Sequence, residues 1–546
     1  MAHTSNPRLQ RRTRGGRFHR PPPLRVSTAL MLWVPSLTAS LLVLLPMSYL
    51  ALRVLGGGLS AWRLVFRPST LEVIWNSGVL AAAVTACSAL IAVPLAWLTV
   101  RTDLPGRRTW TVLISLPLVI PSYVAAYLFI AALGPRGMLQ QWLEGVFGIT
   151  RLPTIYGFPG ALIVLTLMTY PYMYLSVRAA LQGLDPSLEE AARSLGHTGW
   201  ETFRRITLPQ LQPALAAGGL LVALYTLRDF GAVSLMRYNT FTRVIYVQYK
   251  SSFDRTSAAA LALVLVVLTL VLLVIESRIR GQARYHRAAV GAARRAKTIK
   301  LGRWRWPALA FCASVVALAL VLPATVLFYW LIRGWLAGEE FVSLWAPLRN
   351  SLSVSAIAAI VTTAFALPIA FVEIRWPSRL SRFVERTTYI GYALPGIVIA
   401  LAFVFFGVRF ARPIYQTIWL LILAYVVLFL PQAVGAIRAS LLQVNPSVEE
   451  AARSLGRKPW EVLVYITLPL VRPGLVAAFG LVFLTTMKEL PATLILGPFD
   501  FKTLATVVWG AVSEAFFARA AAPALLIILA SSVPMAFFVV REEAGE

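Results

Sequence analysis

Two matching stretches of acidic and small residues are the strongest functional signal in this 546-residue chain. Each has two glutamates, two alanines and, four residues later, a glycine: Glu189, Glu190, Ala191, Ala192 and Gly196, then Glu449, Glu450, Ala451, Ala452 and Gly456. Asp185 or Asn445, then Pro-Ser and the glutamates, predict a capped helix start, with a capping box of Ser187 with Glu190 and of Ser447 with Glu450. The glycine ends each helix. Such a helix suits docking against a partner rather than catalysis.

Two adjacent charged pairs lie in otherwise apolar sequence, Arg228-Asp229 and Lys488-Glu489, 260 positions apart. Charges inside a membrane are costly and usually face a cavity or a partner. Neighbouring residues on a helix point about 100° apart, so neither pair neutralises itself face to face. Two interpretations stay open: ion pairs that hold two parts of the chain together, or groups that line or gate a pathway.

Metal, redox and nucleotide chemistry have little support. The cysteines, Cys87 and Cys312, lie in apolar runs without a CxxC pattern, and none of the four histidines lies in an apolar run. A phosphate-binding GxxxxGK[ST] loop is excluded because no Gly-Lys pair occurs. We therefore expect no enzymatic activity and no cofactor in this chain. Metal ligands stay unknown. Five tyrosines could offer phenol oxygens to a ferric ion: Tyr123, Tyr127, Tyr170, Tyr172 and Tyr174. More often, however, such residues pack helices together.

The composition is that of a membrane protein. The chain is 58% hydrophobic and only 14% charged, yet its formal net charge is +28. Soluble proteins are about 45–50% apolar and about 25% charged. A nucleic-acid binder is excluded because such proteins are rich in charge. Basic loops between membrane spans explain both features, and we expect the lipid bilayer as the main surroundings.

An all-α fold with about twelve transmembrane helices is predicted, since each span needs about 20 apolar residues. In the first half the expected spans are 28–50, 76–100, 111–133, 158–181, 212–235 and 258–275. In the second half they are 308–332, 350–372, 389–408, 414–436, 473–496 and 519–540.

Basic residues predict the orientation. They crowd the tail before the first span and the segment 276–306. The positive-inside rule places both in the cytoplasm, which requires an even number of spans between them and puts the C-terminus inside as well. A cleaved signal peptide is the weaker alternative, because the first apolar stretch is long and no small-x-small cleavage site closely follows it.

An internal duplication organises the chain. Residues 184–215 and 444–475 are identical at 18 of 32 positions, at an offset of 260. Further back the offset becomes 274, so that Asn76-Ser77 matches Asn350-Ser351 and the first half holds extra residues around 134–157. We expect a cytoplasmic tail 1–26, a first domain 27–275 with its repeated loop at 185–209, a linker 276–306, and a second domain 307–541 with its loop at 445–469. Both domains insert in the same orientation, related by a pseudo-two-fold axis along the membrane normal.

The repeated loop resembles a known family. Its pattern is Glu-Ala-Ala, three residues, Gly, nine residues, Ile-x-Leu-Pro, which is similar to the "EAA" loop of permease subunits in bacterial ABC importers. The matching residues are Glu190-Ala191-Ala192, Gly196, Ile206 and Leu208-Pro209, then Glu450-Ala451-Ala452, Gly456, Ile466 and Leu468-Pro469. The resemblance covers the chain apart from roughly the first 25 residues and the linker, and implies two tandem type I permease domains in the bacterial inner membrane.

The resemblance also implies partners. Each loop would hold a coupling helix that sits in a cleft of a cytoplasmic ATP-binding subunit, present in two copies and carrying ATP-Mg. The outward segments 236–257 and 497–518 correspond at an offset of about 260 and are expected to form short amphipathic helices. They would contact a periplasmic or lipid-anchored solute-binding protein. Without the resemblance, a twelve-span secondary transporter that works without an ATPase stays open, and ATPase co-purification distinguishes the two.

The solute is expected to be ferric iron. The fused layout is similar to that of ferric iron importers, and the stretches 229–234 and 487–494 look most like that group. Thiamine, aminophosphonate or another small anion stay as alternatives. Basic residues also exceed acidic ones in the expected outer loops, which does not favour a bare ferric cation. The ion would travel with anionic ligands or be shielded by the binding protein, or else the solute itself is an anion.

Overall fold

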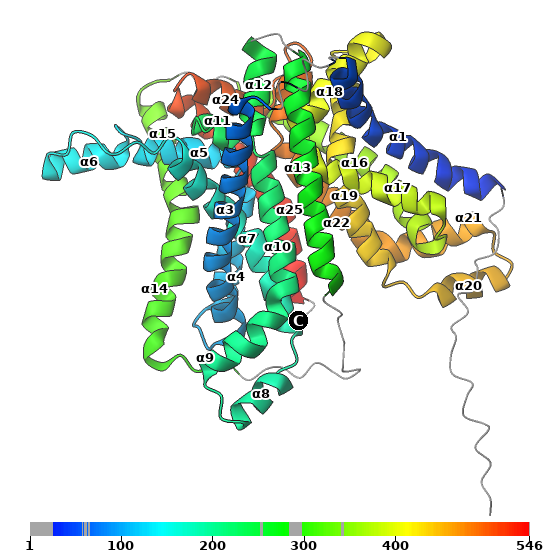
Figure 1. The fold of residues 1–546 in the computed structure, drawn as a ribbon, viewed down its shortest axis with the longest axis horizontal. Coiled ribbons are helices and arrows are strands. Elements are labelled where there is room, and N and C mark those ends of the chain that lie inside the picture. The colour runs from blue at the N-terminus through cyan, green and yellow to red at the C-terminus, as the bar shows by residue number, and fades with distance from the viewer. Residues whose placement is uncertain are drawn as a thin grey trace, which may run out of the picture.

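The structure is a computed structural model that describes residues 26–56, 58, 63, 66–251, 255–282, 298–339 and 343–544. Nearly all regular secondary structure in these residues is helical (Figure 1). Within these described ranges, ten helices are long and apolar enough to cross a membrane. The two other predicted spans correspond to shorter apolar helices, Gly396–Phe410 and Phe517–Val533. The predicted all-α, duplicated membrane fold is confirmed, and most of the tail and much of the linker lie outside the described residues.

The first half runs from α1 to α13. Its helices are α1 (Val26–Gly56), α3 (Pro68–Arg101), α4 (Arg107–Ser115), η2 (Leu116–Val119), α5 (Ser122–Leu133), α6 (Met138–Phe147), α7 (Phe158–Gly183), α8 (Ser187–Ser194), α9 (Gly199–Thr202), η3 (Phe203–Thr207), α10 (Leu208–Arg228), α11 (Gly231–Leu235), α12 (Phe241–Ser251) and α13 (Arg255–Gln282). The residues that are extra in this half form α6, which projects sideways in Figure 1.

The second half repeats this order. Its helices are η4 (Gly302–Trp304), α14 (Arg305–Val316), η5 (Ala317–Val321), α15 (Leu322–Leu336), α16 (Trp345–Arg375), α17 (Arg379–Ile390), η6 (Gly391–Ala393), α18 (Gly396–Phe410), η7 (Arg412–Ile414), α19 (Ile418–Leu441), α20 (Pro446–Ser454), α21 (Pro459–Val462), η8 (Leu463–Thr467), α22 (Leu468–Met487), α23 (Pro491–Leu496), α24 (Leu504–Ser513) and α25 (Phe517–Ala544).

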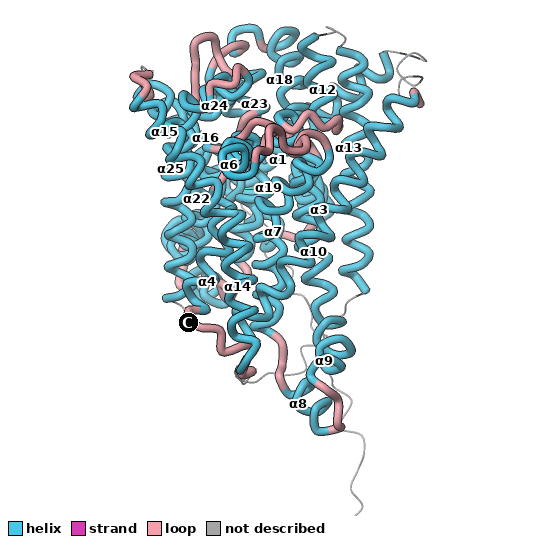
Figure 2. The backbone as a smooth tube through the Cα atoms, turned by 90° about the vertical axis from the view of Figure 1, so that its left-hand side faces the viewer, coloured by secondary structure: helices cyan, strands magenta, loops and turns pink. Residues whose placement is uncertain are grey.

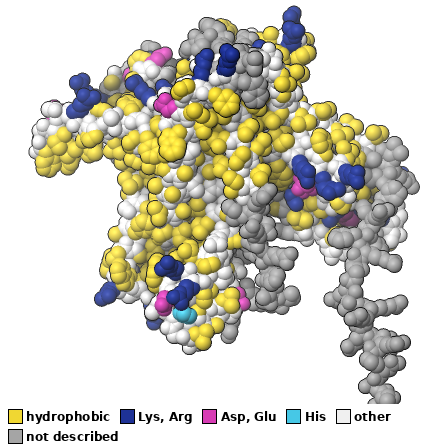
Figure 3. Space-filling view, in the orientation of Figure 1, with side chains coloured by type: hydrophobic (Ala, Val, Ile, Leu, Met, Phe, Trp, Pro, Cys, Tyr) yellow, Lys and Arg dark blue, Asp and Glu magenta, His cyan; other side chains and the backbone are white. Residues whose placement is uncertain are grey.

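Each half is built on three mutually packed helices, α3, α7 and α10 in the first and α16, α19 and α22 in the second. The first helix of each half crosses to the other half. Helix α1 packs on α16, α17 and α18, and α15 packs on α25 of its own half and on α5 of the other. Figure 3 shows apolar side chains over the middle of the molecule and most of the visible Lys and Arg toward its ends and flank.

Spans three and five are broken in both halves. The sequence had predicted each of these spans as a continuous helix. Span three breaks before Pro121 and before Pro395, where extended backbone separates two helical pieces. Span five ends at Arg228 or Met487 and resumes as the short helices α11 and α23. Proline removes a backbone donor, which explains the breaks in span three. The breaks in span five fall at the charged pairs.

The end of the linker docks on the first half. Ile299 donates from its N–H to the Arg101 carbonyl at 2.8 Å, and its own carbonyl accepts from the N–H of Asp103 at 3.1 Å. The Asp103 side chain accepts from the N–H of Leu301 at 2.8 Å. The chain therefore enters its second half beside the C-terminal end of α3.

Candidate functional site

The two repeated loops form short helices, α8 and α9 in the first half and α20 and α21 in the second. Figures 1 and 2 show α8 and α9 at the bottom of the molecule, and Figure 1 shows α20 and α21 on its right-hand flank. Asp185 and Asn445 accept hydrogen bonds from the N–H groups of Ser187 (2.9 Å) and Ser447 (3.0 Å). These bonds support the helix starts and lower the pKa of Asp185. The predicted capping boxes of Ser187 with Glu190 and of Ser447 with Glu450 are wrong, because Asp185 and Asn445 already accept from the first N–H groups.

Gly196 and Gly456 end these helices as predicted. Their φ values are +89° and +84°, in the left-handed region. Glycine adopts that conformation without the steric cost that a Cβ atom adds. The chain turns here into α9 and α21.

The first glutamate of each motif is buried and fixes the loop. Glu189 accepts from the Thr207 hydroxyl at 2.9 Å and forms an ion pair with Arg101 at 3.4 Å. Arg101 is the last residue of α3, and Thr207 immediately precedes α10. One carboxylate thus joins α8 to the C-terminal end of span two and to the start of span five.

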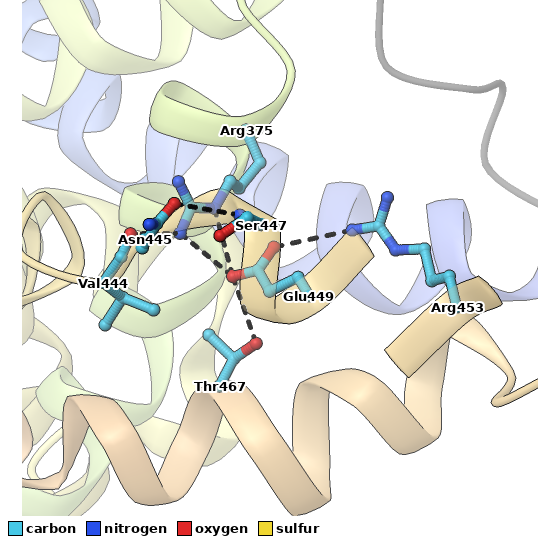
Figure 4. Close-up of polar contacts among 7 residues, drawn as sticks. All are labelled: Arg375, Val444, Asn445, Ser447, Glu449, Arg453 and Thr467. Carbon is cyan, nitrogen blue, oxygen red and sulfur yellow. Dashed lines mark hydrogen bonds and ion pairs between the residues drawn. The ribbon is translucent and has the colours of Figure 1, made fainter. Parts of the chain in front are cut away.

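The second half repeats this arrangement with more contacts (Figure 4). Glu449 accepts from the Arg375 guanidinium at 3.0 Å, from the Thr467 hydroxyl at 3.2 Å and from Arg453 at 3.5 Å. Arg375 is the last residue of α16 and also donates to the Val444 carbonyl at 3.2 Å.

The second glutamate of each motif points outward. Glu190, Glu450, Ala191 and Ala451 are exposed, whereas Ala192 and Ala452 are buried against the protein. Two leucines that follow are almost fully exposed, Leu195 at 81% and Leu455 at 85%. Each half thus presents an apolar and acidic surface at one end of the molecule, which suits contact with another protein.

A short second helix follows each docking helix. The Glu201 carboxylate accepts from the Thr198 N–H at 3.0 Å, which lowers the pKa of Glu201, and the N–H of Glu201 in turn donates to the Thr198 hydroxyl. Glu461 accepts from the Lys458 N–H in the same way. A π-helical turn, η3 or η8, then leads to Leu208-Pro209 or Leu468-Pro469, where the missing proline N–H permits the wider turn.

The carboxylates of the intramembrane pairs start the helices that follow the breaks. Asp229 accepts from the N–H groups of Ala232 (2.9 Å) and Val233 (3.3 Å). Glu489 accepts from the N–H of Ala492 at 3.1 Å, and from the N–H and hydroxyl of Thr493, each at 3.2 Å. A carboxylate at a helix N-terminus satisfies donors that have no partner within the helix.

The cations of these pairs contact the opposite half. Lys488 donates to the Leu118 carbonyl at 2.8 Å, and Arg228 donates to the Tyr392 carbonyl at 3.4 Å. Leu118 and Tyr392 are equivalent positions, both in the broken third span. The contacts between halves are therefore real, but they end on backbone carbonyls. Among the described residues none of the four charges forms an ion pair within 4.0 Å.

The residue next to each of these two carboxylates is smaller where the acidic side chain is longer. Ser122 lies within hydrogen-bonding reach of Asp229. The equivalent of Ser122 is Gly396, where a Cβ atom would lie 2.5 Å from Glu489 Oε1. A shorter acid is paired with a serine in one half, and a longer acid with a glycine in the other.

The five tyrosines considered as iron ligands have different partners, which lie in both halves of the chain. Tyr170 donates to the Ile114 carbonyl, Tyr174 bonds to Thr99, and Tyr127 stacks on Phe517. Tyr123 packs against Gly231, whereas Tyr172 packs on Tyr225 near Arg228. The described residues contain no cluster of three or more His, Cys, Asp and Glu suited to a metal.

The outward segments are held by the repeated Asn-Ser pairs. The Ser77 hydroxyl accepts from the N–H of Phe241 at 3.2 Å, at the start of α12, and the Ser351 hydroxyl accepts from the N–H of Leu504 at 2.8 Å, at the start of α24. The segments therefore correspond at an offset three residues larger than the predicted 260. Beside α24 lies a cavity of about 550 Å³, lined in part by Asp500, Lys502, Glu514 and Arg519.

Sequence reasoning missed the groups that hold the docking helices, namely Arg101, Arg375, Thr207 and Thr467. A signal was present, because both pairs are identical at equivalent positions of the duplication. Their role required knowing that the inner ends of spans two and five meet at the loop.

Comparisons with known proteins agree with this geometry. The family model described as "Binding-protein-dependent transport system inner membrane component" matches residues 88–280 and 362–541. The chain is 35% identical over 496 residues to the Fe(3+)-transport system permease protein FbpB 2 of Haemophilus influenzae, covering 90% of this chain and 94% of that one. It is 27% identical over 457 residues to the putative ferric transport system permease protein FbpB 1 of the same organism, covering 80% and 71%. It is 36% identical over 162 residues to the molybdenum transport system permease protein ModB of Escherichia coli, covering 29% of this chain and 69% of that one.

Proposed function

Because the chain belongs to the family of binding-protein-dependent transport system inner membrane components, we propose that this multi-pass permease imports ferric iron with energy from two copies of a separate ATP-binding subunit. The single observation that carries the proposal is the pair of matched docking helices, each anchored by a buried glutamate and exposed on its outer face. The relatives named for ferric transport span nearly the full chain or most of it.

The anchoring explains how ATP could drive transport. Glu189 and Glu449 join each docking helix to the inner ends of two spans through short contacts. Movement of an ATP-binding subunit would therefore be transmitted directly to spans two and five. Glu190, Ala191, Leu195 and their equivalents form the surface that meets that subunit.

The orientation follows from the same loops. The docking helices and the linker end near Arg101 lie on the cytoplasmic side, with both termini inside. Helices α12 and α24, at the opposite end in Figures 1 and 2, face the solute-binding protein. Phe499, which is 90% exposed on the loop before α24, is an apolar contact point for that partner.

The intramembrane pairs act as a gate. Lys488 and Arg228 bind the broken third span of the opposite half. Opening the pathway separates the halves and breaks both contacts. Alternating access then exchanges them for contacts with solute or water.

Import of an oxyanion is the second candidate. It is favoured by two cationic side chains at the contact between halves. A relative named for molybdenum transport matches part of the chain. Thiamine and aminophosphonate have no comparable observation in their favour.

The test is iron uptake into proteoliposomes that hold the permease with its cognate ATP-binding subunit, with the cognate binding protein outside and ATP in the lumen. We expect radioactive iron to enter only with ATP. In the Leu195→Asp/Leu455→Asp variant the ATP-binding subunit should no longer co-purify. The matched control Phe499→Asp, on the opposite face, should keep it. Uptake without the ATP-binding subunit would establish a secondary transporter instead.

A further inference from the structure

The charges around the contact between halves point to the form in which the solute crosses. We propose that the ferric ion passes as a complex of net negative charge, carrying oxygen-donor anions, and that Arg228 and Lys488 receive it. This inference rests on the proposed import of ferric iron and adds the chemical class of the translocated species.

The acidic side chains at this level are already occupied. Both oxygens of Glu489 accept hydrogen bonds from α23, and Asp229 accepts two from α11. A carboxylate committed to helix N–H groups is a poor ligand for a cation that must bind and leave quickly. Coordinating iron through either oxygen of Glu489, or through Oδ1 of Asp229, would compete with the N–H groups of the helix that follows.

The basic side chains retain unused donors. A guanidinium has five N–H donors and an ammonium has three. Arg228 and Lys488 each donate to one backbone carbonyl across the contact, and neither meets a carboxylate of the described chain within ion-pair distance. Arg228 interacts electrostatically with Glu489 of the opposite half from beyond ion-pair distance. The remaining donors of both cations suit the oxygens of an anionic ligand.

The neighbouring side chains fit such a ligand too. Tyr172 and Tyr225 pack together near Arg228 in the first half. At the equivalent positions of the second half, the Thr485 hydroxyl lies 3.4 Å from the Gln432 side-chain oxygen. All four are partly exposed, although α7 and α19 are among the most buried spans. Hydroxyl and amide groups donate hydrogen bonds to anion oxygens while carrying no charge themselves.

A bare ferric ion is disfavoured by the same arrangement. A bare ferric ion would meet the donor groups of Arg228 and Lys488 in a region of low dielectric constant, where repulsion is weakly screened. The two carboxylates beside them are held on helix N–H groups and are less able to offset that repulsion. Anionic ligands reverse the sign of this interaction. They also account for the net positive outer loops, which attract an anionic complex and repel a free cation.

A double-label uptake experiment tests the proposal in the reconstituted transporter. The binding protein is loaded with ⁵⁵Fe together with ³²P-phosphate or with ¹⁴C-citrate, and both labels are counted in the lumen. We expect iron and one labelled anion to enter in a constant ratio, with net negative charge moved inward when current is recorded on a solid-supported membrane. Iron entering without either anion, or an inward positive current, overturns the inference while leaving iron import intact. If no iron enters under either loading, the proposed function fails and this inference fails with it.

Charge variants separate an electrostatic role from a structural one. Arg228→Lys and Lys488→Arg keep the charge and should keep most of the uptake. Arg228→Gln and Lys488→Gln should lose most of it while the ATP-binding subunit still co-purifies. Lys300→Gln, at an exposed lysine near the end of the linker, is the matched control and should transport as the wild type. Unchanged uptake in the double Gln variant would refute the role of these cations.

Discussion

The Nζ atom of Lys488 donates a 2.8 Å hydrogen bond to the carbonyl oxygen of Leu118, which lies 370 residues earlier and in the other half of the chain. Arg228 makes the equivalent contact with Tyr392. Both acceptors lie where a membrane span is broken, because only there is a backbone carbonyl free of its helical partner. The two halves are thus joined at equivalent breaks in their third spans.

Removing one of these contacts should loosen the join between halves. In Lys488→Met the Leu118 carbonyl loses its partner, at a cost of about 1–3 kcal/mol for a buried unsatisfied group. We expect a lower thermal unfolding midpoint in detergent. Lys502→Met, which removes an exposed lysine from the outer loop, should leave the midpoint unchanged. Equal midpoints for the two variants would show that the contact contributes nothing to stability.

The two glutamates of each motif should respond differently to neutralisation. Glu449→Gln leaves Arg375 and Arg453 facing a neutral amide, and breaking a buried pair typically costs about 3–5 kcal/mol. Glu450→Gln changes an exposed side chain, for which about 0.5 kcal/mol or less is usual. Thermal unfolding measures the difference.

The same pair of variants also separates anchoring from docking. Glu450→Gln should weaken binding of the ATP-binding subunit in a pull-down while leaving the unfolding midpoint in place. If Glu450→Gln proved the more destabilising change, the assignment of the buried and exposed glutamates would be reversed.

The first half pairs Ser122 with Asp229, whereas the second half pairs Gly396 with Glu489. This difference predicts that a second substitution restores the stability that a first one removes. Gly396→Ser places a Cβ atom 2.5 Å from Glu489 Oε1, and such overpacking typically costs about 1–3 kcal/mol. Adding Glu489→Asp recreates the pairing of Ser122 with Asp229 and should restore stability and uptake. A double-mutant cycle should give a coupling energy of about 0.5–3 kcal/mol. Additive effects would contradict this account.

The cap formed by Glu201 predicts a pH dependence with a defined sign. The Thr198 N–H lowers the pKa of Glu201 below its ordinary value of 4.5. The stabilisation is therefore complete above that ordinary value and is lost as the pH falls through the lower folded pKa. Hydrogen exchange of the amides in α9 should accelerate at acidic pH in the wild type. Glu201→Gln should exchange equally fast at both ends of the range.

The duplicated sequence was sufficient to predict much of the architecture. Long apolar runs predicted the spans, and the matched loops predicted two docking helices ended by Gly196 and Gly456. The extra residues around 134–157 were assigned to the first half, where they form α6. These features depend on local composition and on comparison within the chain.

Features that depend on distant contacts escaped prediction. The sequence predicted a continuous span over 212–235 despite the charged pair Arg228-Asp229. Only the carboxylate of Asp229 on the N–H groups of α11 shows why a new helix starts there. The partner of Lys488 is a backbone carbonyl, which carries no sequence signature. The role of Arg101 required the inner ends of two spans and a loop to be brought together.

The crossing of α1 onto the second half has a consequence for how the protein is made. Its partners α16, α17 and α18 leave the ribosome only after the entire first half has been synthesised. Until then α13 is the partner that α1 has in its own half, and the face that meets the second half is unmatched. Ser36 and Ser40 satisfy their hydroxyls within the helix, on the carbonyls of Leu32 and Ser36. The first helix to enter the membrane is thus among the last to reach its native place, and assembly of the bundle waits for the second half.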